Sequence, residues 1–593
     1  MACMENSLVI LLLSMVVLLI AFYGYTIEQR IIAGIQFSND RNELKEESKS
    51  GFFKKQTIAH RKELEEKILL LHEINKFCRK ESHEMTANMA ELINETVTCG
   101  SEWVKQLENN QQGDVVTGSK ETLRQDILSG AKVRISFGNY YADTQSTSIL
   151  NDEVCVQSLF HISKNGWDKH QTDAYWWFLN VCSTGNVHMS RWYVGSHTQP
   201  STPETKAKYS VKWFTRQLSS DSNLQIPFIC NSDSGSVSCG NIQHLTRAVA
   251  NGAEIHVTNV NGKQAGALEF SNIAYDKAET KVAGSHLWHV SQSIVGNHIE
   301  FQQNSYWWFN LWSTDGTRDM SRWSVGEHTD RGHSNDKVSM KWFADTCWTL
   351  AYEHDKDGQA IDGSLDFLRS AILVGKRVRL VFPDYTCGIE ADQLVVRNGH
   401  VTAQVLGHVS ITHSQKFQDN AYWYWQNVAT TGNVETIRYN VGSHTNRGSS
   451  NDRQATKWFI DSRPWVHAYS NSETGVTTHG SKASLIQGVK AGKMLRYIIK
   501  STTRNQQNND YIAVFNADNA DLSPDGNNLG AQHIRSIGLT GDGLYNVAFG
   551  SKPYWNFIIA TTAGKLDETR WTVGEHQSQG HYNSTSAIDW FVS

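Results

Sequence analysis

The spacing of apolar residues changes between two periods in the same way four times along the chain. In the first copy Leu123, Ile127 and Gly130 stand at positions i, i+4 and i+7. Apolar residues at i and i+4 predict a short amphipathic helix, and the Gly predicts its end, because glycine adopts the left-handed conformation at low cost. The period then becomes two at Val133 and Ile135, which predicts a strand. The equivalent glycines are Gly252, Gly375 and Gly492, and the expected helix N-caps are Ser119, Ser364 and Ser481.

A four-residue aromatic block and a turn follow in each copy, and the next strand carries the motif Arg-aromatic-x-Val-Gly-[Ser/Glu]-His. The aromatic blocks are residues 175–178, 306–309, 422–425 and 554–557. The motif marks each copy, and we interpret its residues as structural ones that hold the module together. Each Arg is expected to form a structural ion pair, with carboxylate or phosphate binding as the alternative. Each His is expected to bond a backbone carbonyl in the turn after the Gly. The motif residues are Arg191, Trp192, Gly195, His197, Arg322, Trp323, Gly326, His328, Arg438, Tyr439, Gly442, His444, Arg570, Trp571, Gly574 and His576.

The distance between copies is far longer than the period of a solenoid, so each copy is expected to be a small domain of its own. We predict an α+β fold, mostly β. Each Trp-rich module is expected to hold one short helix and an antiparallel sheet of about five or six strands. Polar linkers are expected between the modules. The predicted module limits are 117–216, 238–345, 362–462 and 479–593.

The chain begins with a predicted membrane segment. Residues 8–25 carry no charge and are long enough to cross a hydrocarbon core of about 30 Å as a helix. A cleaved signal peptide is the alternative, but Phe22 and Tyr23 crowd the positions where a cleavage site needs small residues. We therefore predict an uncleaved signal anchor after a short tail at 1–7. Basic residues follow the span, which favours a cytoplasmic C-terminal side. Long C-terminal regions are nevertheless often translocated, so the repeats are expected outside the cell or in a lumen.

A helical stalk is predicted at 26–112, between the membrane segment and the first module. From Leu64 onward the apolar residues alternate between spacings of four and three, which indicates an imperfect heptad register and a coiled coil. Asn75 at an a-type position favours a homodimer, and Cys78 and Cys99 at d-type positions are candidates for an interchain disulfide. The alternative is a single amphipathic helix lying on the first module.

The cysteines and the glycosylation sequons give information on the compartment in which the repeats lie. The chain has nine cysteines, but the fourth copy has none, so the module fold does not depend on disulfides. In an oxidising compartment the candidate local pairs are Cys155 with Cys182 and Cys230 with Cys239, and buried free thiols are the alternative. The candidate glycosylation sites are Asn94 and Asn583.

Composition and motifs narrow the function classes. A net charge of −5 and a pI near 6.6 argue against nucleic acid as a partner. The chain contains no Gly-x-Ser-x-Gly, no Walker-type loop and no His-Glu-x-x-His. We therefore predict no enzyme, no catalytic residue and no cofactor. The pairs His328/His333 and His576/His581 lack the further ligands that zinc needs, and Ser449 replaces the second His in the third copy, so no metal site is predicted.

The aromatic block offers the first candidate ligand site. Alternate residues of a strand face opposite sides of a sheet. The third position of the block is Trp or Tyr in three copies but Asn556 in the fourth. The constant Trp555 and Phe557 are therefore expected in the core. The variable position is expected on a more exposed face, where aromatic rings bind sugars or cations. The candidates at this position are Trp177, Trp308 and Tyr424.

A polar loop after the motif is the second candidate ligand site. Its Gly and Asn recur in three of the four copies, and loops on rigid scaffolds often carry binding residues. A turn stabilised by the Asn side chain is the alternative. The candidate residues are His333, Asn335, Asn451 and His581.

These features predict a single-pass, membrane-anchored, multivalent recognition or adhesion protein at the cell surface, with an extracellular glycan or protein as its ligand. Weak sites on one tether gain roughly 10²–10⁴ in avidity when they engage together. A structural, matrix or spacer protein without a ligand is the alternative, and an enzyme with one active module is the third interpretation.

Overall fold

The structure is a computed structural model. It describes residues 102–593, except for 163, 172–173, 200–203, 217–226, 262–263, 271, 277, 279, 291, 296–297, 302–304, 385–386, 410–421, 501–511 and 539–552. The predicted tail, the membrane segment at 8–25 and the stalk up to residue 101 lie outside the described residues. Within the described part, none of the helices has the length and apolar character to cross a membrane. Val104–Asn109 forms a strand, so the helical stalk does not extend to residue 112 as predicted.

Each copy runs through the same order of elements: a hairpin, a short helix, a series of strands and a closing strand. The first copy comprises β1 (Val104–Asn109), β2 (Val115–Gly118), α3 (Lys120–Leu128), β3 (Lys132–Phe137), β4 (Tyr140–Asp143), β5 (Ser146–Leu150), β6 (Glu153–Ile162), β7 (Tyr175–Cys182), β8 (Asn186–Tyr193), β9 (Glu204–Lys208) and β10 (Val211–Arg216). The second comprises β11 (Ile229–Asn231), β12 (Val237–Gly240), α4 (Ile242–Ala250), β13 (Glu254–Asn261), β14 (Gln264–Glu269), β15 (Asn272–Tyr275), β16 (Val282–Val290), β17 (Gln292–Val295), β18 (His298–Phe301), β19 (Tyr306–Ser313), β20 (Thr317–Ser324), β21 (Asp330–Lys337) and β22 (Met340–Asp345).

The third and fourth copies repeat this order without the extra hairpin of β17 and β18. The third comprises β23 (Trp348–His354), β24 (Ala360–Gly363), α5 (Leu365–Leu373), β25 (Val378–Phe382), β26 (Cys387–Glu390), β27 (Gln393–Arg397), β28 (His400–Val409), β29 (Tyr422–Ala429), β30 (Asn433–Asn440), β31 (Asn446–Arg453) and β32 (Thr456–Asp461). The fourth comprises β33 (Val466–Asn471), β34 (Thr477–Gly480), α6 (Lys482–Lys490), β35 (Leu495–Lys500), β36 (Ile512–Asn516), β37 (Asn519–Leu522), β38 (Leu529–Gly538), β39 (Tyr554–Thr561), β40 (Lys565–Thr572), β41 (Ser578–Thr585) and β42 (Ala587–Val592).

The four helices of the described residues begin and end where the sequence predicts. Ser119, Ser364 and Ser481 cap them, because each hydroxyl accepts a hydrogen bond from a backbone N–H in the first turn. Asn241 has this role in the second copy. The four glycines after the helices all adopt positive φ, between 79° and 86°. The predicted short helix followed by a strand is therefore confirmed in every copy.

Four ten-stranded antiparallel sheets dominate the fold, and each of the four is shared between two copies. The second copy also forms a small sheet of its own, the hairpin of β17 and β18. The strand orders are β2-β1-β10-β3-β4-β37-β38-β39-β40-β41, β12-β11-β22-β13-β14-β5-β6-β7-β8-β9, β21-β20-β19-β16-β15-β26-β25-β32-β23-β24 and β31-β30-β29-β28-β27-β36-β35-β42-β33-β34. Each copy thus gives five strands to one sheet and five to the next. The mostly β, antiparallel class is confirmed, whereas the expected separate sheet of five or six strands is wrong.

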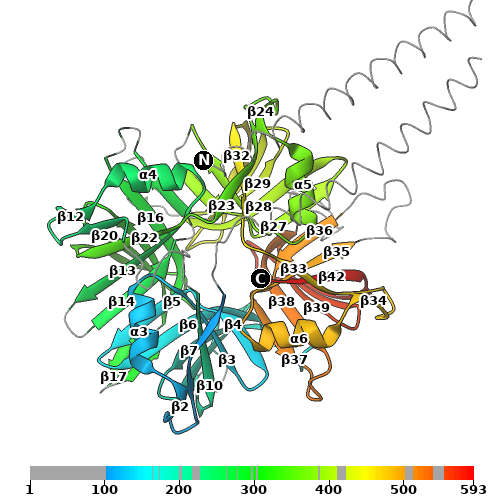
Figure 1. The fold of residues 1–593 in the computed structure, drawn as a ribbon, viewed down its shortest axis with the longest axis horizontal. Coiled ribbons are helices and arrows are strands. Elements are labelled where there is room, and N and C mark those ends of the chain that lie inside the picture. Colours follow the sequence, from blue (N-terminus) through cyan, green and yellow to red (C-terminus); the bar gives the residue numbers. More distant parts are fainter. Residues whose placement is uncertain are drawn as a thin grey trace, which may run out of the picture. The chain divides into compact units, whose positions relative to one another are not determined.

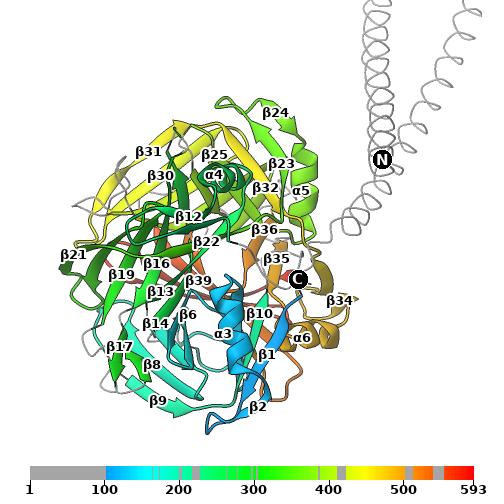
Figure 2. The same ribbon diagram turned by 60° about the vertical axis from the view of Figure 1, so that its left-hand side comes forward.

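The shared sheets connect the four copies into a closed ring. Strand β14 pairs with β5, β26 with β15 and β36 with β27, which joins each copy to the one before it. The ring closes where β37 of the fourth copy pairs with β4 of the first, with Asn519 opposite Ala142. Figure 1 shows α3, α4, α5 and α6 spaced around this ring. In Figure 2, β21 and β31 lie toward the left, and α5 and α6 lie toward the right.

The Trp-Phe pair that ends each copy forms part of the joint between copies. Trp213 is fully buried beneath α3, and its indole N–H donates to Asn109 Oδ1 at 2.9 Å. The Phe of the pair packs against the helix-ending glycine of a neighbouring copy: a Cβ on Gly130 would lie 2.7 Å from the Phe343 ring. The equivalent pairs are Gly252 with Phe459, Gly375 with Phe591 and Gly492 with Phe214. A helix stop therefore also serves as a contact surface between copies.

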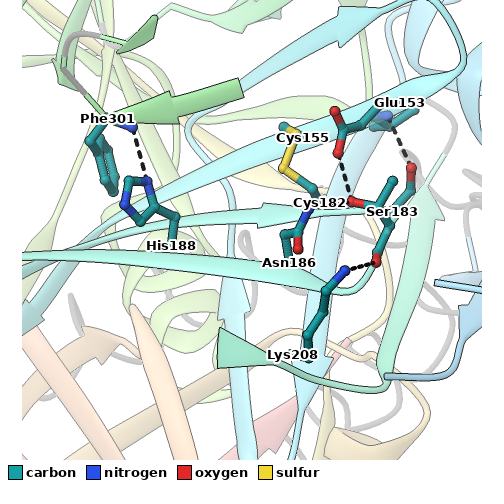
Figure 3. The surroundings of a disulfide bond; sticks show 10 residues. Glu153, Cys155, Cys182, Ser183, Asn186, His188, Lys208 and Phe301 are labelled. Atoms are coloured by element: carbon teal, nitrogen blue, oxygen red, sulfur yellow. Dashed lines mark hydrogen bonds between the residues drawn. A yellow bond between two sulfur atoms is a disulfide. The ribbon is translucent and has the colours of Figure 1, made fainter. Parts of the chain in front are cut away.

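Two predicted disulfides are present, and Figure 3 shows the first of them. Cys155 on β6 is bonded to Cys182 on β7, and Cys230 on β11 to Cys239 on β12. Figure 3 also shows the backbone N–H of Phe301, on β18, donating to His188 Nδ1 on β8 at 3.1 Å. The extra hairpin of the second copy is thereby attached to the first. The candidate interchain pair, Cys78 and Cys99, lies outside the described residues.

Candidate functional site

The repeated motif ends in a hairpin turn that its own residues explain. In the first copy the backbone N–H of His197 donates to Tyr193 O at 3.1 Å and closes the turn between β8 and β9. The His adopts a left-handed conformation with φ of 53°. The other three turns have the same hydrogen bond, and His328, His444 and His576 have φ between 51° and 53°. The predicted contact with a backbone carbonyl is thus made by the main chain, which leaves the side chain available.

The motif glycine allows adjacent turns to approach closely. A Cβ on Gly326 would lie 2.5 Å from the Trp192 ring and 2.9 Å from His197 O, both in the preceding copy. Such distances are too short for any side chain, so the aromatic residue of one motif fits against the glycine of the next. The same relationship joins Trp323 with Gly442, Tyr439 with Gly574 and Trp571 with Gly195. The aromatic residue and the glycine of the motif therefore form a contact between copies.

The close approach brings the four motif histidines together at the centre of the ring, in a cluster that we call the histidine square: His197, His328, His444 and His576. Ring centroids of adjacent copies are 4.0–4.3 Å apart, with interplanar angles of 87–90°. Opposite rings are nearly parallel, with centroids 5.6 Å and 6.2 Å apart. The four adjacent distances are nearly equal and the two opposite distances are longer, so the four ring centroids lie close to one plane at the corners of a square.

Burial gives the histidine square an unusual electrostatic state. It lowers the pKa of His197 and His444 to about 4, and that of His328 and His576 to about 2. All four imidazoles are therefore neutral at neutral pH. Each Nε2 is buried and, among the described residues, none of these four atoms has a hydrogen-bond partner. Buried polar atoms are normally paired, so four orphaned nitrogens at one point require an explanation.

Aromatic side chains surround the histidine square and make its environment apolar. Val194 and Val325, on the turns, share a buried cluster with Phe178 and Phe557. The second aromatic of one block meets the fourth aromatic of the preceding block edge to face, as in Trp307 with Phe178 at 5.1 Å. The equivalent pairs are Trp176 with Phe557, Trp423 with Phe309 and Trp555 with Trp425. The second and fourth positions thus pack together between copies. Asn556, at the third position of the fourth block, is itself fully buried, so this position is not the more exposed one there.

The third position of the aromatic block lies on the opposite face, under the motif arginine. The Arg191 guanidinium lies 5.3 Å from the Trp177 ring centroid and 5.5 Å from that of Tyr175. Trp308 has the same relationship with Arg322, at 5.5 Å. Tyr424 stands opposite Arg438 across β29 and β30. A cation already covers these aromatic faces, so a sugar or ligand cation would have to displace it.

The predicted polar loop forms edge strands instead. His333 and Asn335 lie on β21, Asn451 on β31 and His581 on β41, and each of these strands is the last of its sheet. All four side chains are exposed. Strands replace the expected loop because each Gly-containing segment pairs along its full length with the motif strand beside it. The sequon residue Asn583 is also exposed on β41, and Asn94 lies outside the described residues.

The two sets of candidate ligand residues do not form one site. Across the sheet, His333 is opposite Ser321 and thus shares a face with Phe309, whereas Trp308 is opposite Arg322. Because neighbouring positions of a strand point to opposite faces, the aromatic candidates and the polar candidates face different sides.

A second polar region lines a cavity of about 170 Å³ between the copies. Lys132 of the first copy and Arg377 of the third line this cavity, and the fully buried Glu254 of the second copy lies between the two cations. Burial alone would raise the pKa of Glu254, but these two cations outweigh it and hold that pKa well below its usual range. The ion pairs of Glu254 therefore connect three copies, and Lys132 and Arg377 neutralise its carboxylate.

The histidine square is the part of the site that the sequence interpretation missed. The signal was present, because His ends the motif in all four copies. Treating each copy as a separate domain hid it, since the four residues meet only when the ring closes. No protein-family model, curated protein or solved structure matches this chain.

Proposed function

We propose that this chain is a membrane-anchored, multivalent recognition protein that binds extended polypeptide segments along the free edges of its sheets. One observation carries the proposal: β21, β31 and β41 are equivalent eight-residue strands at the ends of three sheets, with mostly exposed side chains. In the described part of the chain no further strand pairs with their outer sides. An edge strand offers a row of backbone N–H and C=O groups to an added strand, and its side chains provide selectivity.

The ring arrangement favours several weak contacts that act together. The edge strands follow the turns of the histidine square directly, since β21 begins two residues after His328. They therefore start near one centre and belong to a single connected body. Linked sites on such a body gain roughly 10²–10⁴ in avidity if one ligand can engage them at once. Charged residues on these strands, such as Asp330 and Lys337, limit self-association, which is the usual risk of an open edge.

A peptide ligand fits these surfaces better than a glycan bound to aromatic rings. The faces of Trp177 and Trp308 are covered by arginine, whereas the edge strands are open. The expected anchor at 8–25 and the placement of the ring outside the cell are part of the proposal. The competing function is a structural or spacer protein, in which the same edges would have no ligand.

The test is selection of peptides from a displayed library against the full chain in lipid nanodiscs. The triple variant Asn335→Lys, Asn451→Lys and His581→Lys places a bulky cation on each long edge and is expected to reduce binding at least tenfold. The matched control is Gln125→Lys, Gln243→Lys and Gln487→Lys, at exposed positions of three helices, and should bind as the wild type. Backbone N-methylation of a selected peptide should abolish binding, because strand addition uses its N–H groups.

Equal binding by the edge variant and the wild type would reject the edges as the site. Enrichment of no peptide, together with binding on a glycan array, would replace the peptide ligand by a carbohydrate. Enrichment of no ligand of either class would favour the spacer function.

A further inference from the structure

We infer that the histidine square binds one divalent late transition-metal ion of the class that prefers four nitrogens in a plane, Cu(II) or Ni(II). Nothing in this inference depends on the peptide-binding proposal. The ligands would be one imidazole from each copy, so a single ion would connect all four copies at the centre of the ring. Candidate ligand atoms of His197, His328 and His444 lie within 4.8 Å of one another, and His576 completes the square.

The dimensions of the square match those of a metal-bound set. Imidazole nitrogens bind such ions at about 2.0–2.1 Å, which places opposite ring centroids roughly 6.4 Å apart and adjacent ones roughly 4.5 Å apart. The observed separations are 5.6 and 6.2 Å across the square. Along its sides they are 4.0–4.3 Å. An outward movement of each ring by a few tenths of an ångström would reach the bound geometry.

The cyclic arrangement selects the coordination geometry. Four equivalent ligands related by successive rotations about one line have their donor atoms in one plane, so they cannot form a tetrahedron. The observed diagonals, longer than the sides, show this flatness directly. Structural zinc sites are tetrahedral, whereas square-planar or tetragonal nitrogen sets are typical of Cu(II) and Ni(II). Imidazole is a suitable ligand for both ions, and Cu(II) is the tightest-binding divalent ion of the first row.

The presence of histidine at all four positions of the square supports a role for its side chain. The left-handed conformation of these positions is accessible to Asn and Asp as well as His, and glycine adopts it most easily. The turn itself therefore does not require histidine, yet all four copies have it. The Nε2 atoms are buried with no hydrogen-bond partner in the described part of the chain. Because these atoms have no partners, the four rings do not form a cycle of N–H···N hydrogen bonds. Four buried nitrogen atoms without partners would lower the stability of the fold.

The surroundings can accommodate a divalent charge. The residue before each histidine is Ser196, Glu327, Ser443 or Glu575. The two glutamates belong to opposite copies, so the motif places one carboxylate on each side of the centre, and Glu327 is also paired with Arg331 at 3.5 Å. Their side chains reach solvent, with Glu327 73% exposed. Aromatic residues packed against the turns, such as Trp192 beside Gly326, make the surroundings of the square apolar.

Copper titration of the full chain tests the inference. The protein is stripped with EDTA, exchanged into metal-free buffer and titrated with CuCl₂, with the Cu(II) coordination followed by electron paramagnetic resonance. We expect one tetragonal Cu(II) centre with four nitrogen ligands per chain. Competition with ZnCl₂ should show at least tenfold weaker zinc binding at this centre. Incorporation of ¹⁵N-histidine should change the nitrogen splitting, which identifies imidazole as the donor.

The variant His328→Asn removes one ligand and keeps a residue that tolerates the left-handed turn. Its copper affinity should fall at least tenfold, with loss of the four-nitrogen spectrum. The control His333→Asn changes an exposed histidine on the same hairpin and should leave the spectrum unchanged. If His328→Asn fails to fold, the wild-type spectrum still decides the question. Fewer than four nitrogen ligands in the wild type, or an unchanged spectrum in folded His328→Asn, would overturn the inference.

Discussion

Trp192 of the first copy fits against Gly326 of the second so closely that a Cβ on the glycine would lie 2.5 Å from Cζ3 of the indole. The pair is repeated at all four joints of the ring. It explains why the motif keeps an aromatic residue and a glycine three positions later, and why both are needed for closure. The motif thus belongs to the interface between copies.

Gly326→Ala is expected to destabilise the protein by about 1–3 kcal/mol, because the added methyl overpacks the joint and must displace Trp192. The free energy of unfolding in urea measures the change. Gly388→Ala is the matched control, since its Cβ would meet Ile273 at 3.4 Å, an ordinary contact. The control should stay within about 0.5 kcal/mol of the wild type. Equal effects of the two substitutions would mean that the Trp192 contact does not limit closure.

Glu254→Gln is expected to destabilise the ring by about 1–3 kcal/mol, because it removes the buried carboxylate that Lys132 and Arg377 share. Each cation keeps one carboxylate partner, Glu269 for Lys132 and Glu390 for Arg377. Asp366→Asn removes the partner of Arg369 in an exposed pair at 3.1 Å and should cost at most about 1 kcal/mol. Thermal unfolding of both variants beside the wild type makes the comparison. A loss for Glu254→Gln no larger than that of the control would show that the buried cluster does not hold the copies together.

Stability of the metal-free protein should fall as the pH drops below about 6.5. Burial keeps the pKa values of the histidine square at about 4 and about 2, whereas an unfolded histidine titrates near 6.5. Between those values the unfolded chain binds more protons than the folded one, so protonation favours unfolding. The loss should begin near pH 6.5 and continue to about pH 4. Urea unfolding in EDTA at pH 7.5, 6.0 and 5.0 measures it, and His328→Asn should show a smaller decrease over the same range.

The disulfide of the first copy should stabilise the fold without being required for it. Its 27-residue separation corresponds to about 3–4 kcal/mol in the chain-entropy account. The third copy forms the same strand pair with Thr402 opposite Ala429. The double variant Cys155→Thr and Cys182→Ala reproduces that pair and should fold with a lower urea midpoint. Circular dichroism and urea unfolding are the measurements, and failure of this variant to form the β fold would contradict the prediction.

Much of the local structure follows from short-range sequence signals. Ser119 caps a helix, Gly130 ends it, and alternation at Val133 and Ile135 forms the next strand. These features depend on residues a few positions apart, so their pattern is visible in one copy. The two local disulfides match the candidate pairs of the sequence, and each joins neighbouring strands of a hairpin.

The distribution of strands between sheets was not predictable from the same signals. A strand such as β4 has the same alternating pattern whether its partner is a strand of its own copy or β37 of the last. Separate sheets and shared sheets therefore give nearly the same hydrophobic pattern. The incorrect expectation of separate sheets also affected the site, because independent copies would place the four motif histidines in four separate turns.

The sequence by itself determined the repeat, the helix and strand order of each copy, and the choice of residues at the turns, because these depend on backbone preferences and on nearby side chains. Only the tertiary structure decided that the copies share sheets and that the last closes on the first. Closure depends on contacts between residues hundreds of positions apart, such as Asn519 with Ala142. The histidine square exists for the same reason: four identical positions in the sequence become one site when a ring places them around a common centre.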